Sequence, residues 1–249
     1  MSGHSKWANI RHRKARGDAQ KGNVYSKMAK EIMVAARHGG GNPDGNFGLK
    51  IAIQKARDFN VPWDNIQRAI KRGTGEIEGV TLEELTYEGY GPGGVAVVVE
   101  VLTDNRNRTA SDLRFIFSKS GGNLAESGAT SWLFRPKGSI MVDKAVVSED
   151  DLMMMALDAG ADDLLPGGGE SFEVTTAPDS LGDIEQFLRS HGAKVISSEL
   201  VRVPQTTVQV SGRDAELTLR LMESLEDHDD VRKVFSNFDI SDEELAKHA

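Results

Sequence analysis

Hydrophobic spacing near the N-terminus predicts three short amphipathic helices. Val24, Met28 and Ile32 recur on one side of a helix at 3.6 residues per turn, while Lys and Arg residues occupy the opposite side. The same pattern recurs twice more before a glycine-rich connection. The three helices are predicted over residues 24–38, 47–59 and 62–73. They predict a small helical bundle with a cationic exterior, whereas residues 4–23 are polar and show little apolar periodicity.

The remainder of the chain alternates predicted strands and helices. A continuous apolar strand is predicted at 95–102, and Thr109 with Asp112 forms a capping-box pattern that predicts the start of the next helix. A second strand is predicted around 131–134. Further strands are predicted at 138–143, 171–177, 194–203, 206–210 and 231–240, with helices starting after Ser148, after Ser180 and over 213–227.

This alternation in small units predicts an α+β fold with ferredoxin-like layers. We expect the β–α unit at 95–120 and the β–α–β unit at 206–240 to share one sheet, with a second ferredoxin-like domain inserted between them. The expected domains are a basic helical domain at 1–75, a ferredoxin-like domain at 76–134 with 206–249, and an inserted ferredoxin-like domain at 135–205.

Charge is strongly segregated along the chain. Residues 1–75 hold 15 Lys and Arg against 5 Asp and Glu, whereas the whole chain has a formal net charge of −8. A basic block on an acidic body is typical of a polyanion-binding module. The absence of cysteine excludes disulfides and thiolate chemistry and fits a reducing compartment. No apolar segment approaches the ~20 residues that a membrane span needs, so we expect a cytoplasmic protein without a membrane partner.

The candidate nucleic-acid site is the cationic N-terminal segment. Its cations can neutralise phosphates, and Trp7 among them can stack on an unpaired base or anchor the segment to the bundle. The alternative is that these charges only solubilise a helical surface. The candidate residues of this segment are Lys6, Trp7, Arg11, His12, Arg13, Lys14, Arg16, Lys21, Lys27 and Lys30.

Arg106 and Arg108 are further candidates because they immediately precede the predicted helix start at Thr109. Helix N-terminal amides together with two guanidinium groups favour a phosphate. Pairing of the two arginines with carboxylates of the acidic body is an equally good interpretation.

No pattern in the sequence indicates catalysis. The six histidines lack metal-binding spacing, and "GYGPGG" at 89–94 precedes a strand and lacks the residues of a phosphate-binding loop. "EDHDD" at 226–230 is interpreted as a solvated charged turn, and "LMMMA" at 152–156 as the core face of a helix. We therefore expect no enzyme activity, no cofactor, no metal and no small-molecule substrate.

Several long motifs closely resemble the YebC family. They are "GHSKWANIRHRKARGDAQKG", "VPWDNIQRAIKRG", "YEGYGPGGVAVVVEVLTDNRNRTASDLR" and "FSKSGGNLAESGATSW". The resemblance implies three domains, one ferredoxin-like domain inserted in the other, and a non-enzymatic role in gene expression. The family contains bacterial probable transcriptional regulators and mitochondrial translational activators. Asn23, "NFGLK" at 46–50 and Ala125 depart from the family pattern, and the first two remove positive charge.

The leading hypothesis is a regulator that binds DNA through its basic N-terminal domain, and we expect it to be a monomer. The alternative is a ribosome- or rRNA-binding translation factor, for which Trp7 and Tyr25 should matter more because single-stranded bases stack on aromatic rings. A third class is a protein-interaction adaptor whose acidic body binds a basic partner.

Overall fold

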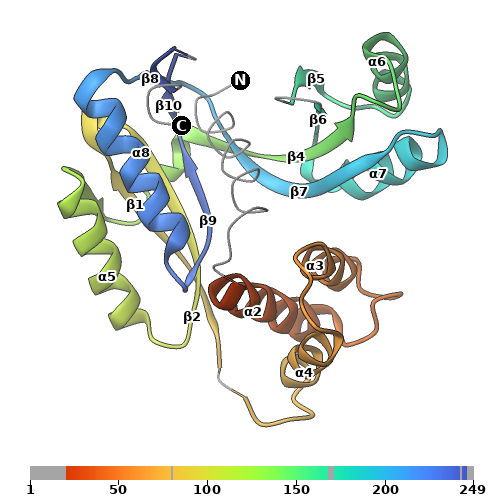
Figure 1. The fold of residues 1–249 in the computed structure, drawn as a ribbon, viewed down its shortest axis with the longest axis horizontal. Coiled ribbons are helices and arrows are strands. Elements are labelled where there is room, and N and C mark those ends of the chain that lie inside the picture. The colour runs from red at the N-terminus through yellow and green to blue at the C-terminus, as the bar shows by residue number, and fades with distance from the viewer. Residues whose placement is uncertain (1–20, 80, 168–170, 242, 246–249) are drawn as a thin grey trace.

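The computed structural model describes residues 21–79, 81–167, 171–241 and 243–245, with side chains from residue 24 onward. Three parts can be followed in Figure 1: a group of helices and two separate four-stranded sheets, each with its own helices. The α+β fold class, with a helical region followed by sheet domains, is confirmed. Within the described residues, no helix is both long enough and apolar enough to cross a bilayer.

The helical part contains α2 (Lys21–Gly39), α3 (Phe47–Asp58) and α4 (Trp63–Gly73), so the three predicted helices are confirmed. Their core includes Ile32, Leu49 and Ile66. Buried Asn46 caps α3 by accepting a hydrogen bond from the Leu49 amide, and its Nδ2 donates to two carbonyls at the end of α2. A polar side chain buried at such a junction needs these partners, and together they fix the angle between the two helices.

The first sheet has the strand order β3-β1-β2-β9 with every neighbouring pair antiparallel. Its strands are β1 (Glu83–Tyr90), β2 (Ala96–Thr103), β3 (Asn123–Ala125) and β9 (Val231–Ser236). Helices α5 (Arg106–Lys119) and α8 (Gly212–Asp227) pack their apolar sides onto one face, where Val97, Val99, Phe117 and Leu221 form the core. As expected, segments on both sides of the inserted region share this sheet.

The strands of this region differ from the sequence prediction at three places. Residues 83–90 have no predicted strand but form β1, which pairs with β2 along its full length. The predicted strand at 131–134 is mostly a 3₁₀ turn over Ser131–Leu133. The segment 206–210 contributes only β8 (Val208–Gln209), which pairs with β10 (Phe238–Asp239) outside the main sheet. Each segment owes its state to pairing or packing with another segment, which local propensity does not report.

The second sheet is built from a βαββαβ unit with the strand order β5-β6-β4-β7, again antiparallel throughout. Its elements are β4 (Phe134–Asp143), α6 (Glu149–Asp158), β5 (Asp163–Pro166), β6 (Ser171–Thr176), α7 (Leu181–Ser190) and β7 (Val195–Pro204). The connectivity and order are those of a ferredoxin-like unit. The proposed domain boundary at residue 135 falls one residue after the start of β4.

The long strands β4 and β7 connect the two sheets (Figure 1). Phe134 and Val201 pack against Ala96, Val98 and Phe235 on the face of the first sheet that α5 and α8 leave uncovered. This second apolar contact explains why β2 is buried on both faces. It also orients the inserted unit relative to the first sheet.

Candidate nucleic-acid interface

Most of the predicted N-terminal site lies outside the described residues. This holds for Lys6, Trp7, Arg11, His12, Arg13, Lys14 and Arg16, and for the side chain of Lys21. Their part in binding stays a prediction. The described members of the predicted site are Lys27, Lys30, Arg106 and Arg108.

Lys27 and Lys30 of α2 point toward the first sheet domain. The Lys30 ammonium lies 2.7 Å from Oδ1 of Asp230 and also donates to the carbonyl of Asp229. The Lys27 ammonium donates to the carbonyl of Glu226. Two cations predicted for phosphate binding are therefore engaged within the protein, where they join the helical domain to the segment that precedes β9.

Asp230 is the centre of this contact, and only 3% of its side chain is exposed. Its Oδ2 lies 2.8 Å from an Arg108 guanidinium nitrogen and accepts hydrogen bonds from two threonine hydroxyls. Burial opposes ionisation of Asp230, but hydrogen bonds from Arg108, Lys30 and Thr109 outweigh it and hold the pKa well below its usual value. We call this cluster the Asp230 junction; it comprises Asp230, Lys30, Thr103, Arg108 and Thr109.

The Asp230 junction corrects the interpretation of "EDHDD" as a solvated turn. Asp230 is buried, and its amide donates to Nδ1 of the half-buried His228. That bond requires an unprotonated Nδ1, so the Nε2 proton of His228 faces the Asp112 carboxylate at 3.3 Å. The acidic segment is thus partly a structural connection, not only a charged surface.

Arg106 and Arg108 lie inside the first turn of α5, not ahead of the helix. The cap is Asn105, whose side chain accepts from the Arg108 amide, so the predicted cap at Thr109 was wrong. Arg108 pairs with Asp104 as well as Asp230, which is the carboxylate-pairing alternative. Arg106 is exposed and forms no ion pair with a described residue.

Tyr25 is also engaged within the helical domain. Its ring packs against the core of the three helices and its hydroxyl donates to the Asn60 carbonyl at 2.9 Å. The face that would stack on a base is therefore partly covered by the protein itself.

Other exposed cations of the described helical domain lie on α3 and α4, whereas exposed Arg37 of α2 donates to the Leu82 carbonyl. They are directed away from the buried sides of these helices, and none forms an ion pair with a described residue. These residues are Lys50, Arg57, Arg68, Lys71 and Arg72. Trp63 begins the same helix as the last three, and 51% of it is exposed. The helical periodicity of the sequence already places these five cations outward, although only the structure shows that none is ion-paired within the described part of the chain.

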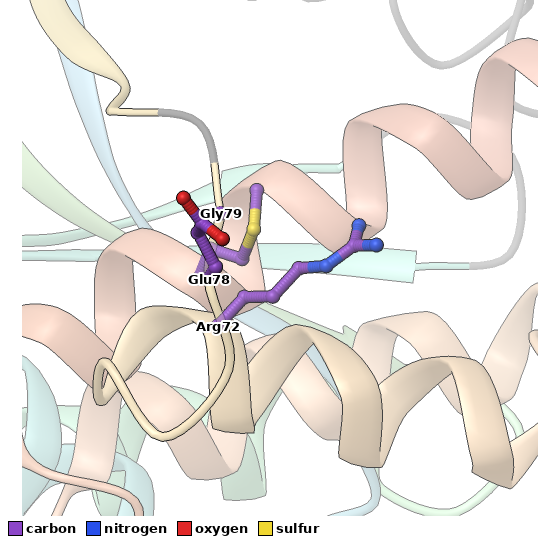
Figure 2. A pocket seen from close by; sticks show the side chains of 4 residues that line it. Arg72, Glu78 and Gly79 are labelled. Carbon is purple, nitrogen blue, oxygen red and sulfur yellow. The ribbon is translucent and has the colours of Figure 1, made fainter.

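Beside this surface lies an open hollow of about 410 Å³, lined by Met33, Arg72, Glu78 and Gly79. In Figure 2, the charged ends of Arg72 and Glu78 point away from each other, so the two do not neutralise one another. A carboxylate on the wall disfavours a phosphate inside the hollow. Arg72 therefore presents its charge beside the hollow, on the outer surface of α4.

No catalytic grouping is found among the described residues. In that part of the chain, no three His, Asp or Glu side chains are arranged to hold a metal ion. Buried Glu88 has a structural role, since its carboxylate accepts hydrogen bonds from the backbone amides of Gly128, Thr130 and Ser131. Burial raises the pKa of Glu88, but these backbone bonds outweigh it and lower the pKa below its usual value.

The fold and this surface define a class: a helical domain with exposed cations, joined to two ferredoxin-like sheet domains of which one interrupts the other. Residues 5–76 match the family model for the TACO1/YebC protein N-terminal domain, and residues 82–238 match the TACO1/YebC second and third domain. The chain belongs to the TACO1/YebC family, which confirms the resemblance seen in the sequence.

Relatives match over nearly the whole chain. A probable transcriptional regulatory protein of Dictyoglomus turgidum is 55% identical, with 98% of both chains covered. One of Pelotomaculum thermopropionicum is 51% identical, covering 97% of this chain and all of the relative. The crystal structure of a conserved hypothetical protein, Aq1575 of Aquifex aeolicus, is 45% identical with a TM-score of 0.83, covering 90% of this chain and 93% of that one.

Proposed function

We propose that this protein is a non-enzymatic regulator of gene expression that binds DNA through its basic N-terminal domain. Its relatives are named probable transcriptional regulatory proteins. The observation that carries the proposal is the segregation of charge: the first 75 residues have three times as many cations as anions, whereas the chain as a whole is acidic. In this proposal the protein acts as a cytoplasmic monomer without a small-molecule substrate.

The exposed cations of α3 and α4 support polyanion binding in particular. A cation already paired with a carboxylate gains little from a phosphate, because the existing pair must first be broken. No such pair has to be broken for Arg68, Lys71 and Arg72, because none of them is ion-paired with a described residue. The N-terminal segment adds further positive charge. Contacts of this kind go to phosphates, so we expect binding with little sequence preference.

A second candidate is a ribosome- or rRNA-binding translation factor. The half-exposed Trp63 favours it, because an aromatic ring next to cations is suited to stack on an unpaired base. Duplex DNA offers no such base. The two candidates therefore differ in what they require of Trp63.

The proposal is tested by measuring fluorescence anisotropy of labelled duplex DNA and single-stranded RNA with the full chain over a range of salt concentrations. Two charge variants are compared with the parent: Arg68→Gln/Lys71→Gln/Arg72→Gln, and a variant with Arg11, Arg13, Lys14 and Arg16 changed to Gln. We expect both to bind more weakly. The slope of log affinity against log salt should fall by roughly 0.9 per lost phosphate contact on duplex DNA and roughly 0.7 on single strands.

A matched control neutralises four exposed cations of the sheet domains that form no ion pair with a described residue: Arg114, Lys119, Arg135 and Arg213, each changed to Gln. This control should bind like the parent. If all three variants bind as the parent does, the basic domain is not the interface, and the adaptor hypothesis becomes the better account. Equal weakening in all three would indicate only a general charge effect.

Trp63→Ala separates the two candidates. Stacking of one base is worth about 1–3 kcal/mol, so a translation factor should lose roughly 5- to 150-fold in affinity for single-stranded RNA while its duplex DNA affinity is unchanged. Equal affinities of the variant and the parent for RNA would remove stacking at this position. Crosslinking in cells, followed by sequencing of bound DNA and bound RNA, then identifies the physiological target.

A further inference from the structure

Helix α6 of the inserted unit has apolar residues on two opposite sides. Leu152 and Ala156 face inward and are buried in the core of the second sheet domain. On the outside, Met153 is 37% exposed, Met154 60% and Leu157 67%. The interpretation of "LMMMA" as helix core was therefore wrong for two of its methionines. A solvated helix face normally carries polar residues at such positions.

The outward apolar residues form a continuous surface. At 3.6 residues per turn, Glu149, Met153 and Leu157 make one row along the helix, and Asp150, Met154 and Asp158 make the neighbouring row. Val146, which precedes the helix, is 51% exposed. We define the α6 outer face as Met153, Met154 and Leu157, with Val146, Glu149, Asp150 and Asp158 around them.

The charge around this surface has a single sign. Residues 149–163 contain six Asp and Glu and no Lys or Arg. Asp162 is neutralised by Lys137, and Asp151 accepts the hydrogen bond of the Ser148 hydroxyl inside the helix cap. Glu149, Asp150 and Asp158 are exposed and form no ion pair with a described residue. The apolar residues thus lie among uncompensated negative charges.

We propose that the α6 outer face is a docking surface for a basic amphipathic helix of a protein partner. Apolar side chains of such a helix would cover Met153, Met154 and Leu157, and its Lys and Arg would meet Glu149, Asp150 and Asp158. Methionine suits this role because its unbranched side chain adapts to the shape of the partner. Nucleic acid is excluded as the occupant because the acidic rim repels phosphates.

The position of α6 allows this contact to coexist with nucleic-acid binding. In Figure 1, α6 lies at the outer end of the second sheet domain, away from α2, α3 and α4. A partner on the α6 outer face would leave the exposed cations of α3 and α4 free. Docking of a partner on the α6 outer face therefore does not depend on the proposed nucleic-acid binding.

The experiment uses the full chain and a fluorescein-labelled Lys/Leu peptide whose leucines follow helical spacing, with a scrambled peptide of the same composition. Two variants test the surface: Met154→Gln/Leu157→Gln removes apolar contact, and Asp150→Asn/Asp158→Asn removes charge. Matched controls are Phe115→Gln, an exposed apolar residue on α5, and Asp179→Asn/Asp183→Asn, two exposed acids near α7. Circular dichroism establishes that every variant is folded.

We expect each test variant to bind the amphipathic peptide at least about tenfold more weakly than the parent, which corresponds to about 1.4 kcal/mol. Both controls should bind as the parent does, and the scrambled peptide should bind weakly to all. Equal binding of the two peptides, or unchanged binding by Met154→Gln/Leu157→Gln, overturns the proposal.

Sedimentation velocity tests the competing occupant, a second copy of the chain. If the parent self-associates and Met154→Gln/Leu157→Gln is a monomer, the face is covered by another copy and the proposal of a basic partner is wrong. A parent that stays monomeric while binding the peptide supports it.

Discussion

The Asp230 junction should be the most sensitive polar contact between the helical domain and the first sheet domain. Asp230→Ala removes the carboxylate that Lys30 and Arg108 share and takes away the acceptor of the Thr103 hydroxyl and one acceptor of the Thr109 hydroxyl. Breaking a buried ion pair by removing one partner typically costs 3–5 kcal/mol. Here the Lys30 side chain is 18% exposed and that of Arg108 48%, so water can partly rehydrate both cations.

We therefore expect the lower end of that range, a loss of about 3 kcal/mol in the free energy of unfolding. For a chain of this size, each kcal/mol lowers the melting temperature by about 2–4 °C, so Asp230→Ala should melt roughly 6–12 °C below the parent. The assay is thermal unfolding followed by circular dichroism, repeated in urea to obtain the midpoint shift.

Asp104→Ala is the matched control. Asp104 is the other carboxylate partner of Arg108, at the same 2.8 Å, but its side chain is 40% exposed. An exposed pair contributes about 0–1 kcal/mol, so this variant should melt within roughly 4 °C of the parent. If Asp230→Ala melts as high as Asp104→Ala, burial does not amplify the interaction and the reasoning about the Asp230 junction is refuted.

Three further outcomes are expected, all measurable by the same unfolding assays. Because Asp230 and Glu88 have lowered pKa values in the folded state, the unfolded chain binds protons at higher pH; their stabilisation is complete above about pH 5 and is lost as the pH falls below about 4. A melting temperature that stays constant from pH 7 to about pH 3 would contradict this. Gly89→Ala should cost about 1–3 kcal/mol, because its Cβ would lie 2.6 Å from the Phe117 ring, whereas Gly48→Ala, with only an ordinary contact, should leave the midpoint nearly unchanged. Phe117→Ala should cost about 3–5 kcal/mol because the ring is fully buried, and a loss below 1 kcal/mol would mean that α5 does not pack as described.

The elements that the sequence predicted well are those with a strong local signal. The helices of the N-terminal part repeat apolar residues at helical spacing, α2 and α4 end at glycines, and β2 is an apolar run broken only by Glu100 before its terminal Thr103. The helix start predicted after Ser148 is confirmed, since the Asp151 amide donates to the Ser148 hydroxyl and that hydroxyl donates to the Asp151 carboxylate. In each case the residues within one or two turns carry the information.

The elements that the sequence missed depend on contacts with other segments of the chain. Strand β1 contains three glutamates and a glycine, a poor strand sequence, yet it pairs along its whole length with β2. Glu88 within it is tolerated because three amides of the 128–131 segment bind its carboxylate. The start of α5 was misplaced because Thr109 matches a capping pattern, although its hydroxyl serves the Asp230 junction.

For the candidate binding surface, too, the sequence predicted one part and missed another. The excess of cations in the N-terminal quarter is a property of the sequence, and helical spacing is enough to place Arg68, Lys71 and Arg72 outward. Which cations remain available could not be predicted. On a helical wheel, Lys27 and Lys30 look as exposed as these three cations. In the structure, however, they form hydrogen bonds with residues about 200 positions further along the chain.

For this protein, the order of residues alone determined the family, the separation of charge, and most of the helices, because these follow from composition and from spacing over a few residues. Tertiary structure decided which charges are neutralised, which weak strands are stabilised, and which methionines stay exposed. These outcomes depend on contacts between different segments, some of them far apart in the chain, and the spacing of residues within one segment does not specify such contacts.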